Sequence, residues 1–245
     1  MRIGGIDIGS RYIKYVLLEG PELVEVHKIE TGYDPLPLCR SLIRETRPDR
    51  LLATGYGRYL LEPDGVKTLT EIRAVSRGAR RVFPSCRTII DIGGQDTKVI
   101  QLNDDGSVEN FEMNDRCAAG TGRFLEMMAK ALGYEMEVFG RQSSSGIDGL
   151  KINSLCAVFA ESEVITLITK GIKREQISAA LHRSIVSKVT GLAKRVGVRS
   201  DVVFTGGCAR NPCLKEMFEE RLETTLLVHE DPDILSALGA ALSAA

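Results

Sequence analysis

Apolar and polar positions along the chain mark two similar pairs of short strands. Apolar runs at residues 3–8 and 88–92 each lead into an aspartate and a glycine, and β-branched runs follow at residues 12–18 and 97–102. Each pair of runs, with a glycine-containing turn between them, predicts a strand, a tight turn and a second strand. Because the second hairpin restarts the pattern, we place a boundary between two half-domains, residues 1–85 and 86–245.

Other segments show helical spacing. Apolar residues recur at intervals of three and four over residues 70–83, which predicts a helix before Pro84. Further helices are expected at residues 38–46, 123–132, 157–170, 174–196, 212–222 and 234–244, with strands at 51–53, 108–113 and 201–204 and a loop at 55–58. Strands and helices in this order predict an α/β fold.

The two hairpins also carry the same polar residues at the same internal spacing. Asp7, Gly9, Ser10 and Lys14 of the first hairpin recur as Asp91, Gly93, Gly94 and Lys98 in the second. A single glycine-containing turn with an aspartate is usually only a turn. Turn chemistry does not require the lysine, so the repetition favours a duplicated phosphate site.

Phosphate chemistry gives each of these residues a role. A glycine lets backbone N–H groups approach phosphate oxygens without a Cβ in the way, and a carboxylate at a strand end can hold the water shell of Mg²⁺. We therefore expect Asp7 and Asp91 to hold Mg²⁺ through water and Lys14 to supply charge. The expected phosphate-binding residues are Gly9, Ser10, Gly93, Gly94 and Gln95, and the expected catalytic residues are Asp7, Asp91 and Gln95.

A third glycine-rich turn follows the strand expected at residues 201–204. Thr205, Gly206 and Gly207 could bring the backbone close to an adenine or ribose, or could form a plain strand-to-helix turn. After the two hairpins, this turn completes an order that resembles the phosphate-1, phosphate-2 and adenosine motifs of the actin, Hsp70 and sugar-kinase superfamily. The resemblance implies two ribonuclease-H-like halves with ATP or ADP in the cleft between them, and it leaves the last helix free to pack on the first half.

Cys117 and Cys156 each lie in a run of small residues where a helix is expected to begin. Neither belongs to a Cys-x2-Cys pair, which excludes a local four-cysteine cluster or zinc site within one chain. Free cysteines are often simply buried, and that interpretation stays open. However, a helix N-terminus favours a thiolate, and a two-fold dimer would bring four such cysteines together around one 4Fe-4S cluster.

Three segments carry a more specific resemblance. Residues 91–98, 114–125 and 153–164 resemble the activator (archerase) family of 2-hydroxyacyl-CoA dehydratases and the related benzoyl-CoA reductase ATPase subunits, the BadF/BadG/BcrA/BcrD family. The resemblance implies that Cys117 and Cys156 of each subunit ligate one 4Fe-4S cluster that bridges a homodimer. It further implies that ATP turnover drives a low-potential electron into a separate dehydratase or reductase, with ferredoxin or flavodoxin as the donor.

Some positions are less readily assigned. Gly120, in the glycine-rich loop after Cys117, is counted among the cofactor-binding residues, as are Gly206 and Gly207.

The chain departs from the family pattern at a few positions. Family members often carry a histidine in the helix matching residues 71–78, where this chain has Val75 and Ser76, and Cys208 replaces a small apolar residue. These differences leave the exact downstream partner open. We interpret Cys39, Cys86, Cys208 and Cys213 as structural and His27, His182 and His229 as surface or core histidines.

The amino-acid composition limits the classes of molecule that the protein is expected to bind. Lys and Arg (32) almost balance Asp and Glu (33), which indicates neither a nucleic-acid surface nor a polybasic membrane anchor. No stretch approaches the roughly 18 uninterrupted apolar residues of a spanning helix, and Asp7 interrupts the region where a signal peptide would be apolar. We therefore expect a cytoplasmic protein that binds small molecules or other proteins, without nucleic acid or membrane.

Two other functions remain open on the sequence. A small-molecule kinase of the same superfamily would need an acceptor pocket with a catalytic carboxylate and would not need Cys117 or Cys156. A nucleotide-dependent assembly protein that polymerises like the actin relatives would need filament interfaces and would carry no visible chromophore. Iron bound to the protein is the feature that separates both from the activator interpretation.

Overall fold

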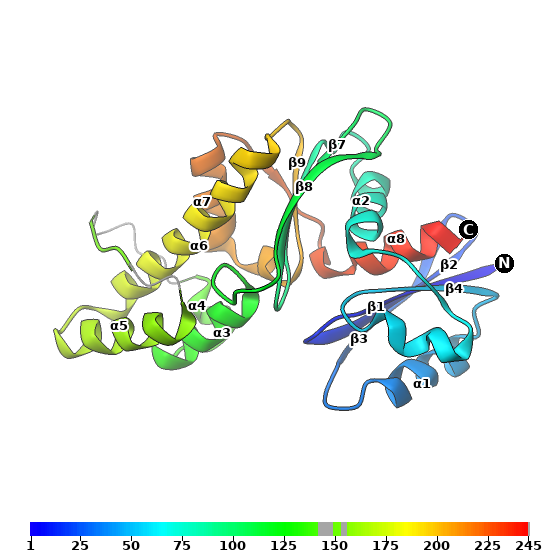
Figure 1. Ribbon diagram of the computed structural model, residues 1–245, viewed down its shortest axis with the longest axis horizontal. Coiled ribbons are helices and arrows are strands. Elements are labelled where there is room, and N and C mark those ends of the chain that lie inside the picture. The colour runs from blue at the N-terminus through cyan, green and yellow to red at the C-terminus, as the bar shows by residue number, and fades with distance from the viewer. Residues whose placement is uncertain (142–148, 153–155, 245) are drawn as a thin grey trace.

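The computed structural model describes residues 1–141, 149–152 and 156–244 of the chain. Over these residues the strands form two five-stranded mixed sheets, which lie in two lobes joined by helices (Figure 1). The α/β class expected from the sequence is confirmed. None of the helices in these ranges is both long and apolar enough to cross a lipid bilayer.

The first sheet has the strand order β3-β2-β1-β4-β5. Its strands are β1 (Arg2–Ile8), β2 (Tyr12–Glu19), β3 (Glu22–Glu30), β4 (Arg50–Thr54) and β5 (Lys67–Thr68), and α1 (Leu36–Thr46) and the 3-10 helix η1 (Arg58–Asp64) connect them. The three hairpin strands are antiparallel, whereas β4 pairs with β1 in parallel. An apolar core that includes Ile6, Ile13 and Leu17 fills the space beneath this sheet.

The second sheet repeats this arrangement in the order β10-β9-β6-β7-β8. Its strands are β6 (Thr88–Ile92), β7 (Thr97–Leu102), β8 (Val108–Asn114), β9 (Val202–Thr205) and β10 (Leu226–Leu227). Again the first three strands form an antiparallel meander, and β9 pairs with β6 in parallel. The repeat is therefore larger than the hairpin that the sequence pattern predicts, because it includes the parallel strand as well.

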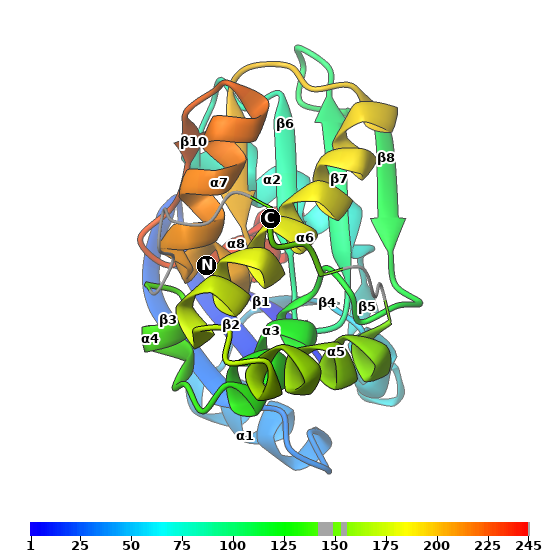
Figure 2. The ribbon, with the colours of Figure 1, turned by 90° about the vertical axis from the view of Figure 1, so that its left-hand side faces the viewer.

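Two helices of the second half, α6 (Arg174–Val196) and α7 (Pro212–Leu222), cover one face of the second sheet (Figure 2). The helices α3 (Gly122–Ala131), α4 (Met136–Phe139) and α5 (Ala157–Thr169) pack on one another beyond the end of this sheet. The long helix α6 begins and ends where its apolar pattern predicts, and it packs against β7 and β8. Its buried stripe includes Ile177, Ile185 and Val189, which belong to the largest core.

Two helices, α2 (Glu71–Val82) and α8 (Leu235–Ala244), lie between the sheets and join the lobes (Figure 1). The last helix, α8, packs on β1 and β4 of the first sheet, while α2 contacts β7 and β8 of the second. The crossing of α2 with α8 and the contact of α8 with β1 both need glycine. A Cβ on Gly239 would lie 1.7 Å from the Ala74 carbonyl oxygen, and a Cβ on Gly5 would lie 2.0 Å from the Ala237 carbonyl oxygen.

Candidate functional site

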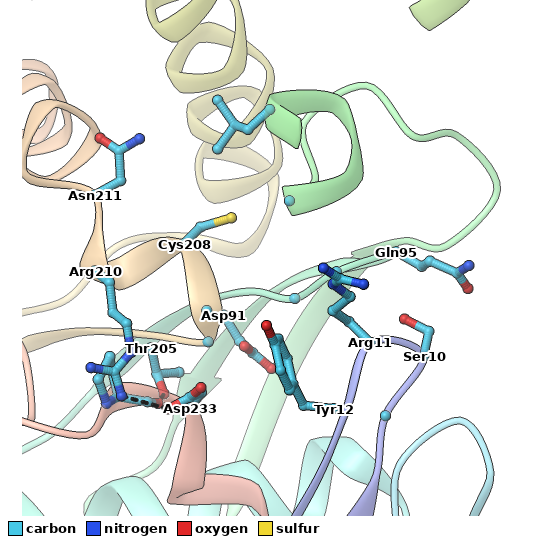
Figure 3. A pocket seen from close by; sticks show the side chains of 18 of the residues that line it. Ser10, Arg11, Tyr12, Asp91, Gln95, Thr205, Cys208, Arg210, Asn211 and Asp233 are labelled. Carbon is cyan, nitrogen blue, oxygen red and sulfur yellow. Dashed lines mark hydrogen bonds and ion pairs between the residues drawn. The ribbon is translucent and has the colours of Figure 1, made fainter. Parts of the chain in front are cut away.

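A cleft of about 770 Å³ lies between the two lobes (Figure 3). Both hairpins line it, and so do the Thr-Gly-Gly turn after β9, the start of α2 and parts of α3 and α4. The structure therefore brings most of the residues expected from the sequence to one cavity. The lining includes Asp7, Gly9, Ser10, Lys14, Asp91, Gly93, Gly94, Gln95, Gly206 and Gly207.

In the first hairpin, the aspartate and the lysine are cross-strand partners. The register of β1 and β2 places Asp7 opposite Lys14, and Lys14 Nζ lies 2.8 Å from Asp7 Oδ2. Burial opposes the lysine charge, but the neighbouring Asp7 carboxylate raises the pKa of Lys14 above its ordinary value. Lys14 therefore balances the buried Asp7 carboxylate and does not face the cleft as an unpaired cation.

The second hairpin has the same register, with Asp91 opposite Lys98, but its lysine has more partners. Lys98 Nζ lies 2.6 Å from Asp96 Oδ2, 2.8 Å from Glu71 Oε2 and 3.6 Å from Asp91 Oδ2. Burial opposes its charge, but the three carboxylates hold the pKa of Lys98 above its ordinary value. Burial also raises the pKa of Asp91 and of Glu71. Three carboxylates against one ammonium leave this side of the cleft negative, as a cation site requires.

The turn at each hairpin tip uses the amide of its first glycine. Gly9 N–H donates to the Tyr12 carbonyl at 3.1 Å, and Gly93 N–H donates to the Asp96 carbonyl at 2.9 Å. The amides of Ser10 and Gly94 have no hydrogen-bond partner among the described residues. The donors that remain for an anion therefore include the amide at the second position of each turn, one residue beyond its first glycine.

The hairpin tips meet across the cleft. A Cβ on Gly94 would lie 3.2 Å from Ser10 Oγ, so little space separates the two turns. Gln95 is exposed at the end of the second hairpin, near Ser10 (Figure 3). An anion held by both tips would therefore contact both halves of the protein.

Each aspartate also lies against a glycine that follows the parallel strand. A Cβ on Gly55 would lie 2.3 Å from Asp7 Oδ1, and a Cβ on Gly206 would lie 2.6 Å from Asp91 Oδ1. Both glycines have positive φ, 94° and 82°, and in each case the preceding threonine is the parallel-strand partner of the aspartate. The sequence analysis recognised only the second Thr-Gly pair. The first, Thr54 and Gly55, repeats it and is visible in the sequence as a second Thr-Gly after a short apolar strand.

Charged side chains beside the Thr-Gly-Gly turn link the two lobes. Asp233 forms ion pairs with Lys28 of β3 and with Arg210, which lies 2.9 Å away just after the turn (Figure 3). Burial opposes the charge of Asp233, but these two cations hold its pKa below the ordinary value. The sequence analysis missed these residues because nothing local relates positions so far apart in the chain.

Gly120 is not brought into the cleft. It is buried behind the second hairpin, where its carbonyl accepts a hydrogen bond of 2.6 Å from Thr97 Oγ1 and the Lys188 stem lies against its α-carbon. Its φ of 89° is the left-handed region that favours glycine. These contacts place Gly120 in the loop before α3, outside the lining of the cleft.

The two candidate cluster cysteines differ in position. Cys156 is exposed and is the residue immediately before α5, as the sequence predicts. Cys117 is half-buried and lies in the glycine-rich loop five residues before α3 begins at Gly122, one residue before the expected start of this helix. The intervening residues form a loop in which Asn114 Nδ2 donates to the Cys117 carbonyl at 2.9 Å. Residues 153–155, which precede Cys156, lie outside the described residues.

The other four cysteines, Cys39, Cys86, Cys208 and Cys213, are all buried. Burial raises the pKa of the Cys39 thiol to about 11 and those of Cys86 and Cys208 to about 12. Burial of this kind makes a thiol unreactive, as expected for structural cysteines. Cys208 lines the cleft beside Gly122.

Across the described residues, no group of three or more His, Cys, Asp and Glu side chains is placed to hold a metal ion within one chain.

Of the three histidines, His182 is fully buried. Its Nδ1 lies 2.8 Å from the Ser178 carbonyl and its Nε2 lies 3.0 Å from Asn211 Nδ2, and burial lowers its pKa to about 4. Asn211 in turn accepts a hydrogen bond from the Leu214 amide at the start of α7. His182 is thus a neutral core residue that orients a helix cap at the edge of the cleft.

Comparisons with known proteins agree with this geometry. The model of the BadF/BadG/BcrA/BcrD ATPase family matches residues 5–244. The chain is 41% identical to the 2-hydroxyisocaproyl-CoA dehydratase activator of Clostridioides difficile, over 98% of this chain and 93% of the relative.

Two solved structures share the fold over all of this chain. One is component A of the (R)-2-hydroxyglutaryl-CoA dehydratase of Acidaminococcus fermentans, with a TM-score of 0.92, 40% identity and 97% of that chain covered. The other is an activator of the 2-hydroxyisocaproyl-CoA dehydratase from Clostridium difficile with bound ADPNP, with a TM-score of 0.90, 39% identity and 94% of that chain covered.

Proposed function

The chain belongs to the BadF/BadG/BcrA/BcrD ATPase family, and we propose that it hydrolyses ATP to drive a low-potential electron from a 4Fe-4S cluster into a 2-hydroxyacyl-CoA dehydratase or a benzoyl-CoA reductase-like partner. The observation that carries the proposal is the cleft itself, where two hairpins present Asp7 and Asp91 from opposite halves. As an ATPase of this family it needs both halves to hold one nucleotide. The relatives named as dehydratase activators support the choice of partner.

The cleft fits ATP with Mg²⁺. Its carboxylates are the oxygen ligands that Mg²⁺ prefers, and the unpaired amides of Ser10 and Gly94 can donate to phosphate oxygens. Gly206 and Gly207, beyond β9, would lie beside the adenosine. When bound, Mg²⁺ supplies positive charge to the phosphate oxygens. The chain's own contribution is to position the nucleotide between the halves and to exclude bulk water from it, so no covalent nucleophile is required.

The cysteines fit a cluster shared between two chains. Cys156 is exposed and Cys117 is half-buried, while the remaining thiols are buried in the protein core. One chain therefore offers two accessible thiols, and a 4Fe-4S cluster takes four. A two-fold dimer supplies the other two, with one cluster per homodimer on the axis. When bound, the cluster supplies a one-electron carrier. We propose ferredoxin or flavodoxin as the electron donor to it.

Replacement of either candidate ligand should remove the cluster. We expect Cys117→Ser and Cys156→Ser proteins, reconstituted anaerobically with iron and sulfide, to lose most of their iron, because serine keeps the size of the side chain and removes the soft thiolate. Iron per chain would be measured together with circular dichroism. The control is Cys208→Ser, which should keep its iron because Cys208 is buried in the cleft wall. A full iron complement in either ligand variant would show that the ligand assignment is wrong.

A further inference from the structure

The tips of both hairpins end on the first turns of one helix, α3. From the second hairpin, the carbonyls of Gly93 and Gly94 accept hydrogen bonds from the amides of Gly122 and Arg123, at 2.9 and 2.8 Å. From the first hairpin, Arg11 Nε lies 3.3 Å from Glu126 Oε1. Helix α3 is therefore held by the nucleotide cleft from both halves of the protein.

The contact with the second hairpin is tight and directional. A Cβ on Gly122 would lie 3.1 Å from the Gly93 carbonyl oxygen and 3.3 Å from Cys208 Sγ, so a side chain would push the helix end away. The N-terminal amides of a helix lack partners within the helix, and here the hairpin carbonyls supply them. A shift of the hairpin tip must therefore shift the end of α3 or break these two hydrogen bonds.

The contact with the first hairpin is a partly exposed ion pair, and Arg11 can leave Glu126 for another anion. Arg11 and Glu126 are 48% and 33% exposed, and Arg11 also lies 3.6 Å from Glu30 Oε1. An ion pair with this exposure contributes little stability. The Arg11 side chain borders the cleft beside Ser10 and Gln95 (Figure 3). A phosphate group bound at the hairpin tips would thus lie within reach of the same guanidinium that holds Glu126.

The end of α3 is connected to Cys117 by a short, internally bonded loop. Thr121 precedes the helix and donates from both its amide and its hydroxyl to the Ala118 carbonyl, at 3.0 and 2.6 Å. Asn114 donates to the carbonyls of Cys117 and Ala119, at 2.9 and 3.2 Å. Because these bonds make the loop stiff, displacement of the α3 N-terminus is transmitted to Cys117 and is not absorbed between them.

We propose that Arg11 and Glu126 are positioning residues through which the nucleotide in the cleft sets the position of the Cys117 loop. A triphosphate carries more negative charge at the hairpin tips than a diphosphate, so it competes more strongly with Glu126 for Arg11. Release of Glu126 leaves the second hairpin as the one hairpin tip that still contacts α3 among the described residues. This inference rests on the proposed ATP-driven function, and it names the residues that connect nucleotide state to the cluster ligand.

The test measures the alkylation rate of Cys117 in iron-free protein by mass spectrometry, with saturating Mg-ADP or the non-hydrolysable analogue Mg-ADPNP. Wild-type protein should show rates that differ at least about fivefold between the two nucleotides, a typical allosteric factor. Glu126→Gln should remove most of this difference while both nucleotides still bind. Glu126→Asp, which keeps the charge, should retain part of it. The matched control is Arg123→Gln, which removes the other ion pair of Glu126, at 3.5 Å within α3, and should keep the difference because the Arg11 contact remains.

Two results of this experiment would overturn the proposed coupling. Equal Cys117 rates in the two nucleotide states of wild-type protein would overturn it, and so would a full difference retained by Glu126→Gln. In both cases nucleotide binding, measured by calorimetry on the same samples, would leave the proposed ATPase function standing. Absence of nucleotide binding to the wild-type protein would overturn the proposed function, and this coupling with it.

Discussion

Asp91→Asn protein should hydrolyse Mg-ATP about 100-fold more slowly than the wild type or worse, a loss typical for removal of one electrostatic contact in an active site. The substitution removes charge at the expected Mg²⁺ position and keeps the shape of the side chain. The fold should survive, because Lys98 retains its ion pairs with Asp96 and Glu71 at 2.6 and 2.8 Å. This variant therefore tests the role of Asp91 in ATP hydrolysis without a loss of the folded structure.

Steady-state phosphate release, with circular dichroism on the same samples, measures this effect. Asp105→Asn is the matched control, since Asp105 lies in the exposed turn after β7 and should leave turnover unchanged. Wild-type turnover by the Asp91→Asn protein would mean that the cleft does not use this carboxylate, and the nucleotide site would have to be reassigned.

Asp7→Asn should slow turnover to a similar extent, but it should also lower the free energy of unfolding. The Lys14 side chain is mostly buried, 15% exposed, and Asp7, 2.8 Å away, is its only ion-pair partner within the described part of the chain. Loss of one partner from a buried ion pair typically destabilises a protein by about 3 to 5 kcal/mol, because the remaining charge is left uncompensated. Urea unfolding should show this difference between the Asp7 and Asp91 variants, although the two hairpins have the same sequence pattern.

A double variant tests that explanation. Replacement of both partners, in Asp7→Asn with Lys14→Met, removes the uncompensated charge and keeps the volume, so most of the lost stability should return. Turnover should not return, because the carboxylate is still absent. If the double variant is no more stable than Asp7→Asn alone, the stability loss does not come from an unpaired Lys14.

The sequence predicted what depends on local spacing. The aspartate, glycine and lysine of each hairpin recur at the same local spacing, which is why the duplicated hairpin could be recognised without a structure. That each lysine lies opposite its aspartate across the strands is seen only in the structure. The helix α6 was predicted with its correct ends because its apolar stripe is long and regular. Strands β5 and β10 were missed because two residues each carry no pattern, and β3 was missed because most of its residues are exposed on an edge of the sheet.

Features that depend on distant parts of the chain could not be predicted. The crossing of α2 and α8 requires Gly78 and Gly239 to meet backbone from the other helix, and neither glycine stands out in the sequence. The ion pairs of Asp233 with Lys28 and Arg210 join positions that no local pattern relates.

The midpoint potential of the iron–sulfur cluster in the ADP-bound and ADPNP-bound dimers tests the central claim most directly. If ATP use is coupled to electron transfer, the nucleotides must favour states with different free energies of cluster reduction, and this linkage is reciprocal. For a one-electron couple, a tenfold change in relative affinity corresponds to about 59 mV. We predict potentials that differ by at least this order between the two nucleotides. Indistinguishable potentials, or a purified dimer without a cluster, would contradict the account.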